Sequence, residues 1–180
     1  LRRRSVRRRR RKRNGIWVEY DARGRPSREA EYRFGALLSA TGKGESNAPA
    51  PIAEVVATIR RDRPNVVFAP HVETAAGIML PDDYLRAVAD AAHEVGALFV
   101  LDCIASGTIW VDMEATGVDV LISAPQKGWS ATPCAGLVML GEEARARIDA
   151  TTSSSFACDL KRWLGIMETY ENGGHAYHAT

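Results

Sequence analysis

The chain has 180 residues, of which 46% are hydrophobic, and a formal net charge of +2. This length suits one domain, and the hydrophobic content is sufficient for a buried core. No apolar run approaches the roughly 20 residues of a bilayer-spanning helix, and no apolar signal segment is present, so we expect no membrane association.

The basic residues are concentrated in residues 1–13, which hold nine arginines and Lys12 but no acidic residue. The rest of the chain holds 14 basic and 22 acidic residues, a balance of −8. Like charges repel one another, and the segment has almost nothing apolar to bury. We therefore predict that residues 1–33 form a basic tail, either disordered or an artefact of a GC-rich gene read out of frame. Residues 34–180 should form the folded part.

The three cysteines are Cys103, Cys134 and Cys158. They are odd in number and show no CxxC spacing, so neither a disulfide framework nor a zinc site is indicated. Free thiols in a reducing cytoplasm are the expected state.

The first regular element is a helix over residues 51–62, where apolar residues recur at helical spacing behind a proline. Pro64 ends this helix, and residues 65–69 are predicted to form a short buried strand. The loop HVETAAG, residues 71–77, follows the strand.

A second helix is predicted over residues 81–95, with acidic residues in its first turn and Gly96 as its stop. A strand over residues 97–104 follows at once. Strand, helix and strand together have the length of a right-handed parallel crossover.

Four further elements complete the chain, namely strands at 118–123 and 135–140 and helices at 141–150 and 159–171. Both strands are continuously apolar, which is typical of a sheet covered on both faces. The predicted fold class is α/β, a three-layer sandwich with a mostly parallel sheet.

Lys127 lies just past an apolar strand, in the segment VDVLISAPQKGW. Open α/β sheets bind their ligands at this edge. On residue type alone, a solvated surface lysine is the commoner case. Beside a bound cofactor, however, a desolvated lysine amine can act as a nucleophile.

Asp102 lies inside another apolar strand, ALFVLDCI. A carboxylate there is costly to bury unless it meets a cation or several hydrogen-bond donors. It either caps the turn after the strand or pairs with a cation. Pyridoxal phosphate (PLP) needs one lysine for a Schiff base and one acidic partner for its pyridinium nitrogen, which Lys127 and Asp102 would supply.

The HVETAAG loop should lie at the same sheet edge as Asp102 and Lys127. The Thr74 hydroxyl could donate to a cofactor or substrate, and Gly77 would allow close backbone approach, although both could serve only to form a turn. His71 is expected to be a structural hydrogen-bonding residue without a catalytic role.

Three segments in this order, PHVETAAG, VLDCIASG and ISAPQKGW, resemble the core of the class V aminotransferases of PLP fold type I. The most similar branch is the alanine–glyoxylate and serine–glyoxylate aminotransferases. The resemblance covers about residues 50–180 and does not extend to the first 33.

The resemblance implies roles for individual residues. Lys127 would form the Schiff base with PLP and move the proton between the substrate Cα and the cofactor. Asp102 would hold the pyridine nitrogen, and Ile104 would pack beneath the ring. Thr74 would lie near the ring oxygen O3′, and Gln126 would contact the phosphate.

The closing segment, GGHAYHAT, is similar to the family's Y-x-x-T motif. By this resemblance, Tyr177 and Thr180 would reach the PLP phosphate of a neighbouring subunit. The resemblance therefore implies a homodimer with shared active sites.

The family's upstream phosphate loop and its ring-stacking aromatic residue have no counterpart in the chain, and the arginine that binds the substrate carboxylate belongs to a later domain. We therefore expect an internal fragment of a longer cytoplasmic enzyme, inactive alone. That enzyme would transfer an amino group from alanine or serine to glyoxylate or a similar 2-oxo acid.

Other class V PLP enzymes are the nearest alternatives. Cysteine desulfurases typically have His where this chain has Gln126; kynureninase-like enzymes and phosphonate aminotransferases stay open. A non-catalytic nucleic-acid-binding protein using the arginine-rich tail is a different class, and its binding would fall steeply with salt. Such a protein has no need of a strand-end lysine paired with an aspartate.

Overall fold

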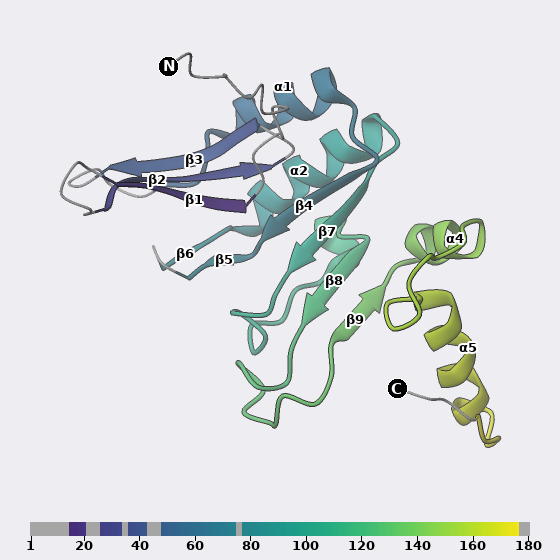
Figure 1. Cartoon of the computed structure of the whole chain (residues 1–180). Coiled ribbons are helices and arrows are strands. Elements are labelled where there is room, and N and C mark those ends of the chain that lie inside the picture. Colours follow the sequence, from purple (N-terminus) through teal and green to yellow (C-terminus); the bar gives the residue numbers. More distant parts are fainter. Residues whose placement is uncertain (1–14, 21–25, 34–35, 43–47, 75–76, 177–180) are drawn as a thin grey trace, which may run out of the picture.

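The computed structural model describes residues 15–20, 26–33, 36–42, 48–74 and 77–176 (Figure 1). The helices among them are α1 (Ile52–Asp62), α2 (Asp82–Glu94), α3 (Met113–Thr116), α4 (Glu142–Asp149) and α5 (Leu160–Glu171). No helix in these ranges is long and apolar enough to cross a bilayer.

The central element is a four-stranded sheet in the order β4-β7-β8-β9. Its strands are β4 (Val66–Pro70), β7 (Leu98–Asp102), β8 (Val120–Ser123) and β9 (Leu137–Leu140). The pairs β4/β7 and β7/β8 are parallel, and β8/β9 is antiparallel. The predicted α/β class with a mostly parallel sheet is confirmed.

A strand–helix–strand unit, β4-α2-β7, places β4 and β7 side by side as the sequence predicts. The connection from β4 to α2 is more regular than expected. β5 (Val72–Glu73), inside the predicted loop 71–77, pairs with β6 (Ile78–Met79), just after it, as a short antiparallel hairpin.

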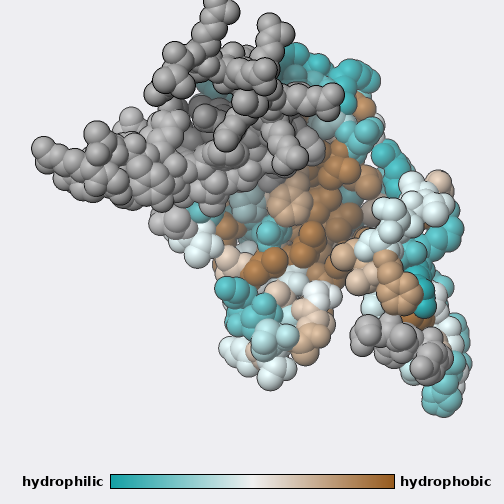
Figure 2. Space-filling view, viewed as in Figure 1, coloured by the Kyte–Doolittle hydropathy of each residue, from teal (hydrophilic) through white to brown (hydrophobic). Residues whose placement is uncertain are grey.

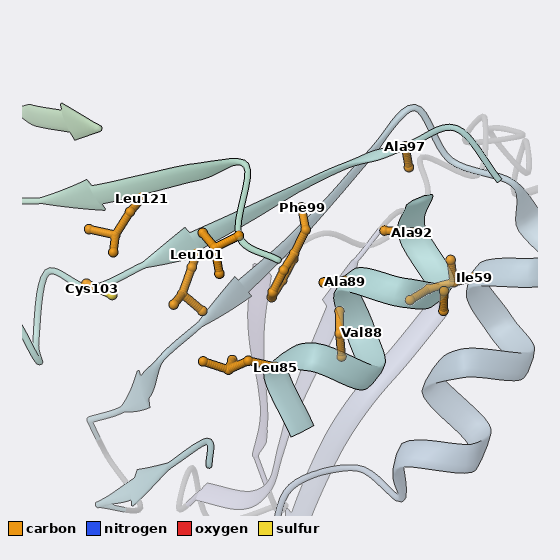
Figure 3. Close-up of a cluster of buried hydrophobic side chains, with 12 residues drawn as sticks. Ile59, Leu85, Val88, Ala89, Ala92, Ala97, Phe99, Leu101, Cys103 and Leu121 are labelled. Carbon is orange, nitrogen blue, oxygen red and sulfur yellow. The ribbon is translucent and has the colours of Figure 1, made fainter. Parts of the chain in front are cut away.

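The hydrophobic core lies between the sheet and α2 (Figure 3). Phe99 and Leu101 of β7 are fully buried, as are Leu85 and Val88 of α2, and Ile59 of α1 packs against the same cluster. Apolar residues at helical spacing give α2 the buried face that anchors it on the sheet.

The opposite face of the sheet is less covered than the continuous apolar runs predict. Burial along β7 alternates, because Leu98 and Val100 are half-buried while Phe99 and Leu101 are fully buried. Val120 of β8 is also half-buried. Figure 2 shows apolar residues gathered at the centre of the visible face, in the region of the strands.

A second sheet includes residues from segment 1–33, which was expected not to fold. The strands β1 (Gly15–Tyr20), β2 (Pro26–Arg33) and β3 (Ala36–Gly42) pair in the antiparallel order β1-β2-β3. A disordered or artefactual tail was expected over residues 1–33, and the residues of β1 and β2 form strands in the structure. The expectation rested on the arginine run, whereas β1 (GIWVEY) has the β-branched and aromatic residues that favour strands. Residues 1–14 lie outside the described ranges.

Candidate active site

A cleft lies at the carboxyl ends of the parallel strands. Its volume is about 530 Å³, within the usual range of small-molecule sites. The residues that line it are Pro70, Val72, Glu73, Thr74, Asp102, Ile104, Ala105, Lys127 and Gly128. These residues come from the ends of β4, β7 and β8 or from the segments that follow them, which is where open α/β sheets bind ligands.

Asp102 is the last residue of β7 and is half-buried. Its Oδ1 accepts a hydrogen bond of 2.9 Å from the backbone N–H of Ile104, so the carboxylate caps the turn after the strand. The same residue lines the cleft. The two alternatives drawn from the sequence are thus compatible, because one oxygen can cap the turn while the carboxylate stays available to a cation.

Lys127 lies in the turn after β8 and is exposed. The turn is held by backbone hydrogen bonds from Lys127 N to the carbonyl of Ala124 and from Ser130 N to the carbonyl of Lys127. Lys161 is the other lysine in the described ranges, and its Nζ donates to the carbonyl of Asp149. Among the described residues, Lys127 is therefore the lysine that lines the cleft.

Two glycines let the turn after β7 meet the turn after β8. A Cβ at Gly128 would lie 2.8 Å from the backbone nitrogen of Thr108, and a Cβ at Gly107 would lie 2.7 Å from Nε1 of Trp129. Neither position has room for a side chain. This contact brings the segment that carries Lys127 against the segment that follows Asp102.

Thr74 and Ile104 complete the predicted set within the cleft. Thr74 is exposed and follows β5, and Ile104 is half-buried in the turn after β7. Both line the cleft together with Asp102 and Lys127. Gln126 is exposed and is not among the residues that line the cleft.

Tyr177 and Thr180, the residues expected to reach a neighbouring subunit, lie outside the described residues. The structure also adds residues that sequence reasoning did not assign. Glu73 lines the cleft beside Thr74, and Gly128 lines it beside Lys127. The sequence signal for both residues was their position next to a predicted site residue, since Glu73 precedes Thr74 and Gly128 follows Lys127. A glutamate or a glycine does not indicate a cleft by its residue type alone.

A buried polar cluster, formed by His71, Cys103 and Ser106, lies next to the turn that follows Asp102. Nδ1 of His71 and the hydroxyl of Ser106 share a hydrogen bond of 2.8 Å, and Sγ of Cys103 lies 3.7 Å from the same nitrogen. Burial lowers the pKa of His71 and raises the pKa of Cys103. The imidazole and the thiol are therefore neutral at neutral pH. His71 has the hydrogen-bonding role that the sequence analysis expected.

The groups that line the cleft fit the cofactor expected from the sequence. PLP requires an amine, an acidic partner for its ring nitrogen and apolar contact with the ring. Lys127, Asp102 and Ile104 provide these groups, and Thr74 adds a hydroxyl.

Comparisons with known proteins relate most of the chain to one protein family. The profile of the family described as "Aminotransferase class-V" matches residues 17–170. The match begins within β1, so the expectation that the resemblance leaves out the first 33 residues is wrong. Alanine–glyoxylate aminotransferase of Oryctolagus cuniculus is 28% identical over 80% of this chain and 34% of its own length. 2-Aminoethylphosphonate–pyruvate transaminase 1 of Burkholderia lata is 33% identical over 71% of this chain and 34% of its own length.

Solved structures show the same fold. Alanine–glyoxylate aminotransferase from Nostoc sp. superposes with a TM-score of 0.61 at 24% identity, covering 78% of this chain and 35% of that protein. Ureidoglycine–glyoxylate aminotransferase from Bacillus subtilis gives a TM-score of 0.61 at 25% identity, covering 76% and 35%. The chain spans about a third of the length of the curated relatives it matches.

Proposed function

We propose, because the chain belongs to the class V aminotransferase family, that the protein it is part of transfers an amino group from alanine or serine to glyoxylate or a similar 2-oxo acid. The family implies a PLP-dependent aminotransferase. The observation that carries the proposal is that Lys127 and Asp102 line one cleft at the carboxyl ends of parallel strands. The Oryctolagus cuniculus and Bacillus subtilis relatives, both named for glyoxylate, support glyoxylate as the acceptor.

We assign the roles within the cleft by the chemistry of each side chain. Bound PLP would supply an electron sink for the bonds at the substrate Cα. The Lys127 amine would hold the cofactor covalently and accept or return the proton at Cα. The Asp102 carboxylate would keep the ring nitrogen protonated. The Thr74 hydroxyl would donate to the ring oxygen, and Ile104 would pack against the ring.

Three further assignments belong to the proposal. Gln126 would contact the cofactor phosphate, although it is not among the described residues that line the cleft. Tyr177 and Thr180 would complete the site of a second copy, which makes the proposed assembly a homodimer. We assign the protein to the cytoplasm, because three cysteines without CxxC spacing are expected to be free thiols in a reducing compartment.

Transfer from 2-aminoethylphosphonate to pyruvate is the second candidate. The observation that favours it is the identity of the Burkholderia lata transaminase, 33%, against 28% for the rabbit enzyme. Both candidates use the same cofactor chemistry, and they differ in the acid group of the donor, a carboxylate or a phosphonate.

The test is a single-turnover measurement with the protein expressed together with the flanking sequence that its gene encodes. The PLP-loaded protein is mixed separately with alanine, serine and 2-aminoethylphosphonate, and the loss of the visible PLP absorption is followed. We expect alanine or serine to react at least about tenfold faster than the phosphonate, a difference of about 1.4 kcal/mol in transition-state binding. The reverse order supports the second candidate, and no reaction with any donor contradicts both.

A further inference from the structure

We infer that His71 is a positioning residue, whose hydrogen bond with Ser106 holds the turn that presents the Asp102 carboxylate to the cleft. The inference rests on the proposed function, in which Asp102 is the partner of the PLP ring nitrogen. It assigns a role to the buried cluster of His71, Cys103 and Ser106, which takes no part in the proposed chemistry.

The backbone of His71 joins two parts of the site. Its N–H donates to the carbonyl of Asp102 at 2.9 Å, which extends the pairing of β4 and β7 by one residue. Its carbonyl accepts from the N–H of Leu80 at 2.9 Å, beyond the hairpin that carries Thr74. His71 is thus the point at which the Thr74 hairpin is fixed to the end of β7.

The side chain of His71 continues this connection into the turn after Asp102. The three members of the cluster are nearly inaccessible, with exposed fractions of 2% for His71, 3% for Ser106 and 2% for Cys103. Water cannot replace the hydrogen bond between His71 and Ser106 at this depth, so its loss would leave Nδ1 of His71 with the weaker contact to the Cys103 thiol, 3.7 Å away. The bond therefore constrains where Ser106 lies.

The position of Ser106 matters because the turn determines the direction of the Asp102 carboxylate. Oδ1 of Asp102 accepts from the N–H of Ile104, inside the segment that ends at Ser106. On the β8 side, this segment is held by a 2.7 Å hydrogen bond from Cys103 N–H to the carbonyl of Ile122. On the β4 side, the His71 side chain holds it.

The cluster acts through geometry rather than charge. Burial is the main cause of the lowered pKa of His71 and of the raised pKa of Cys103. Neither side chain is charged at neutral pH, so neither places a full charge near the Asp102 carboxylate. What they supply is a fixed turn.

The first test is the affinity of the protein, with its flanking sequence, for PLP added to the apo form. Loss of the hydrogen bond in Ser106→Ala or His71→Leu should weaken PLP binding about three- to tenfold. His71→Asn should recover most of the affinity, because its amide can place a polar atom close to the position of Nδ1.

The matched control is Thr116→Val. Thr116 is 1% exposed, and its hydroxyl donates to the carbonyl of Asp112 at 2.6 Å, in the segment before β8 and away from the cleft. This variant should lose stability as Ser106→Ala does but keep the wild-type affinity for PLP. If Ser106→Ala and Thr116→Val both keep that affinity, His71 has a merely structural role and the inference is wrong.

A second test asks whether Ser106 acts through Asp102. In an Asp102→Ala background, Ser106→Ala should have no further effect on the affinity for PLP, because the group it positions is gone. An undiminished effect in that background would contradict the inference.

A third test separates this inference from the proposed function. In the apo-protein with Cys134→Ser and Cys158→Ser, both exposed in the wild type, the alkylation of Cys103 reports on the turn. Faster alkylation in Ser106→Ala than in Thr116→Val supports the connection, and equal rates contradict it. A wild-type protein that binds no PLP would overturn the proposed function, whereas this comparison would still decide whether His71 holds the turn.

Discussion

Two glycines determine how closely the turn that carries Lys127 approaches the turn that follows Asp102. The contact at Gly128 is with backbone, 2.8 Å from the Thr108 nitrogen, so an added methyl group cannot be accommodated by a rotamer change. We predict that Gly128→Ala lowers the free energy of unfolding by about 1–3 kcal/mol and weakens PLP binding. Urea denaturation and PLP titration measure the two effects.

The control for that substitution is Gly136→Ala, because no atom lies within 4 Å of its added Cβ and its backbone is not left-handed. Its free energy of unfolding should stay within about 0.5 kcal/mol of the wild type. Equal effects of the two substitutions would show that the turns can separate freely.

His71 should give the protein a pH-dependent stability. Burial lowers its pKa, although Asp82 partly opposes this, so below about pH 6.5 the unfolded chain takes up a proton before the folded chain does. The free energy of unfolding should therefore fall as the pH falls through this range, and His71→Asn should lack this contribution. Urea denaturation of both proteins between about pH 5 and 7.5 measures the difference. Parallel pH profiles would contradict the prediction.

Among the elements, α2 contributes most of the helical side of the core. Leu85 is 0% exposed and packs in the cluster that includes Phe99 and Leu101. Leu85→Ala should lower the free energy of unfolding by about 2–5 kcal/mol, through lost burial and the cavity left behind. Asp90→Ala, on the exposed side of the same helix, should change it by no more than about 0.5 kcal/mol. Urea denaturation compares the two, and similar losses would mean that α2 is not anchored by its apolar face.

Sequence patterns predicted the long helices and the four strands of the central sheet, but not the shortest elements. The starts of α1 and α2 are confirmed within one residue, because Pro51 and Pro81 fix where each helix can begin. The helix α3 has four residues, too few to show a helical period, and its start depends on Asp112, whose side chain accepts from the N–H of Ala115. The antiparallel direction of β9 depends on the path of the preceding turn, which apolar content does not encode.

The candidate site was predictable only in part, for a related reason. Asp102 and Lys127 could be placed together because parallel strands end at one edge of the sheet. The contact of Gly107 with Trp129 and the hydrogen bond between His71 and Ser106 join residues that are far apart in the sequence. No periodic pattern in the sequence predicts such contacts, because they depend on how separate turns pack against one another.

For the whole molecule, the prediction of shared active sites can be tested by mixing variants. Lys127→Ala removes the lysine from one protomer, and Tyr177→Ala with Thr180→Ala removes the groups that its neighbour would contribute. A mixed dimer of the two would contain one site with all of its wild-type residues. We therefore expect refolded mixtures to bind PLP more tightly than either parent alone, as measured by PLP retention after gel filtration. Retention equal to the average of the parents would contradict shared sites.

In the proposed site, Lys127 holds the cofactor in the cleft that it shares with Asp102. The most direct measurement is borohydride reduction of the PLP-loaded protein, followed by peptide mass spectrometry to locate the pyridoxyl group. We predict the group on Lys127 in the wild type and in Lys161→Ala; the Lys161 removed in that control donates to the Asp149 carbonyl and does not line the cleft. A pyridoxyl group on another lysine, or unchanged labelling of the protein in Lys127→Ala, would contradict it.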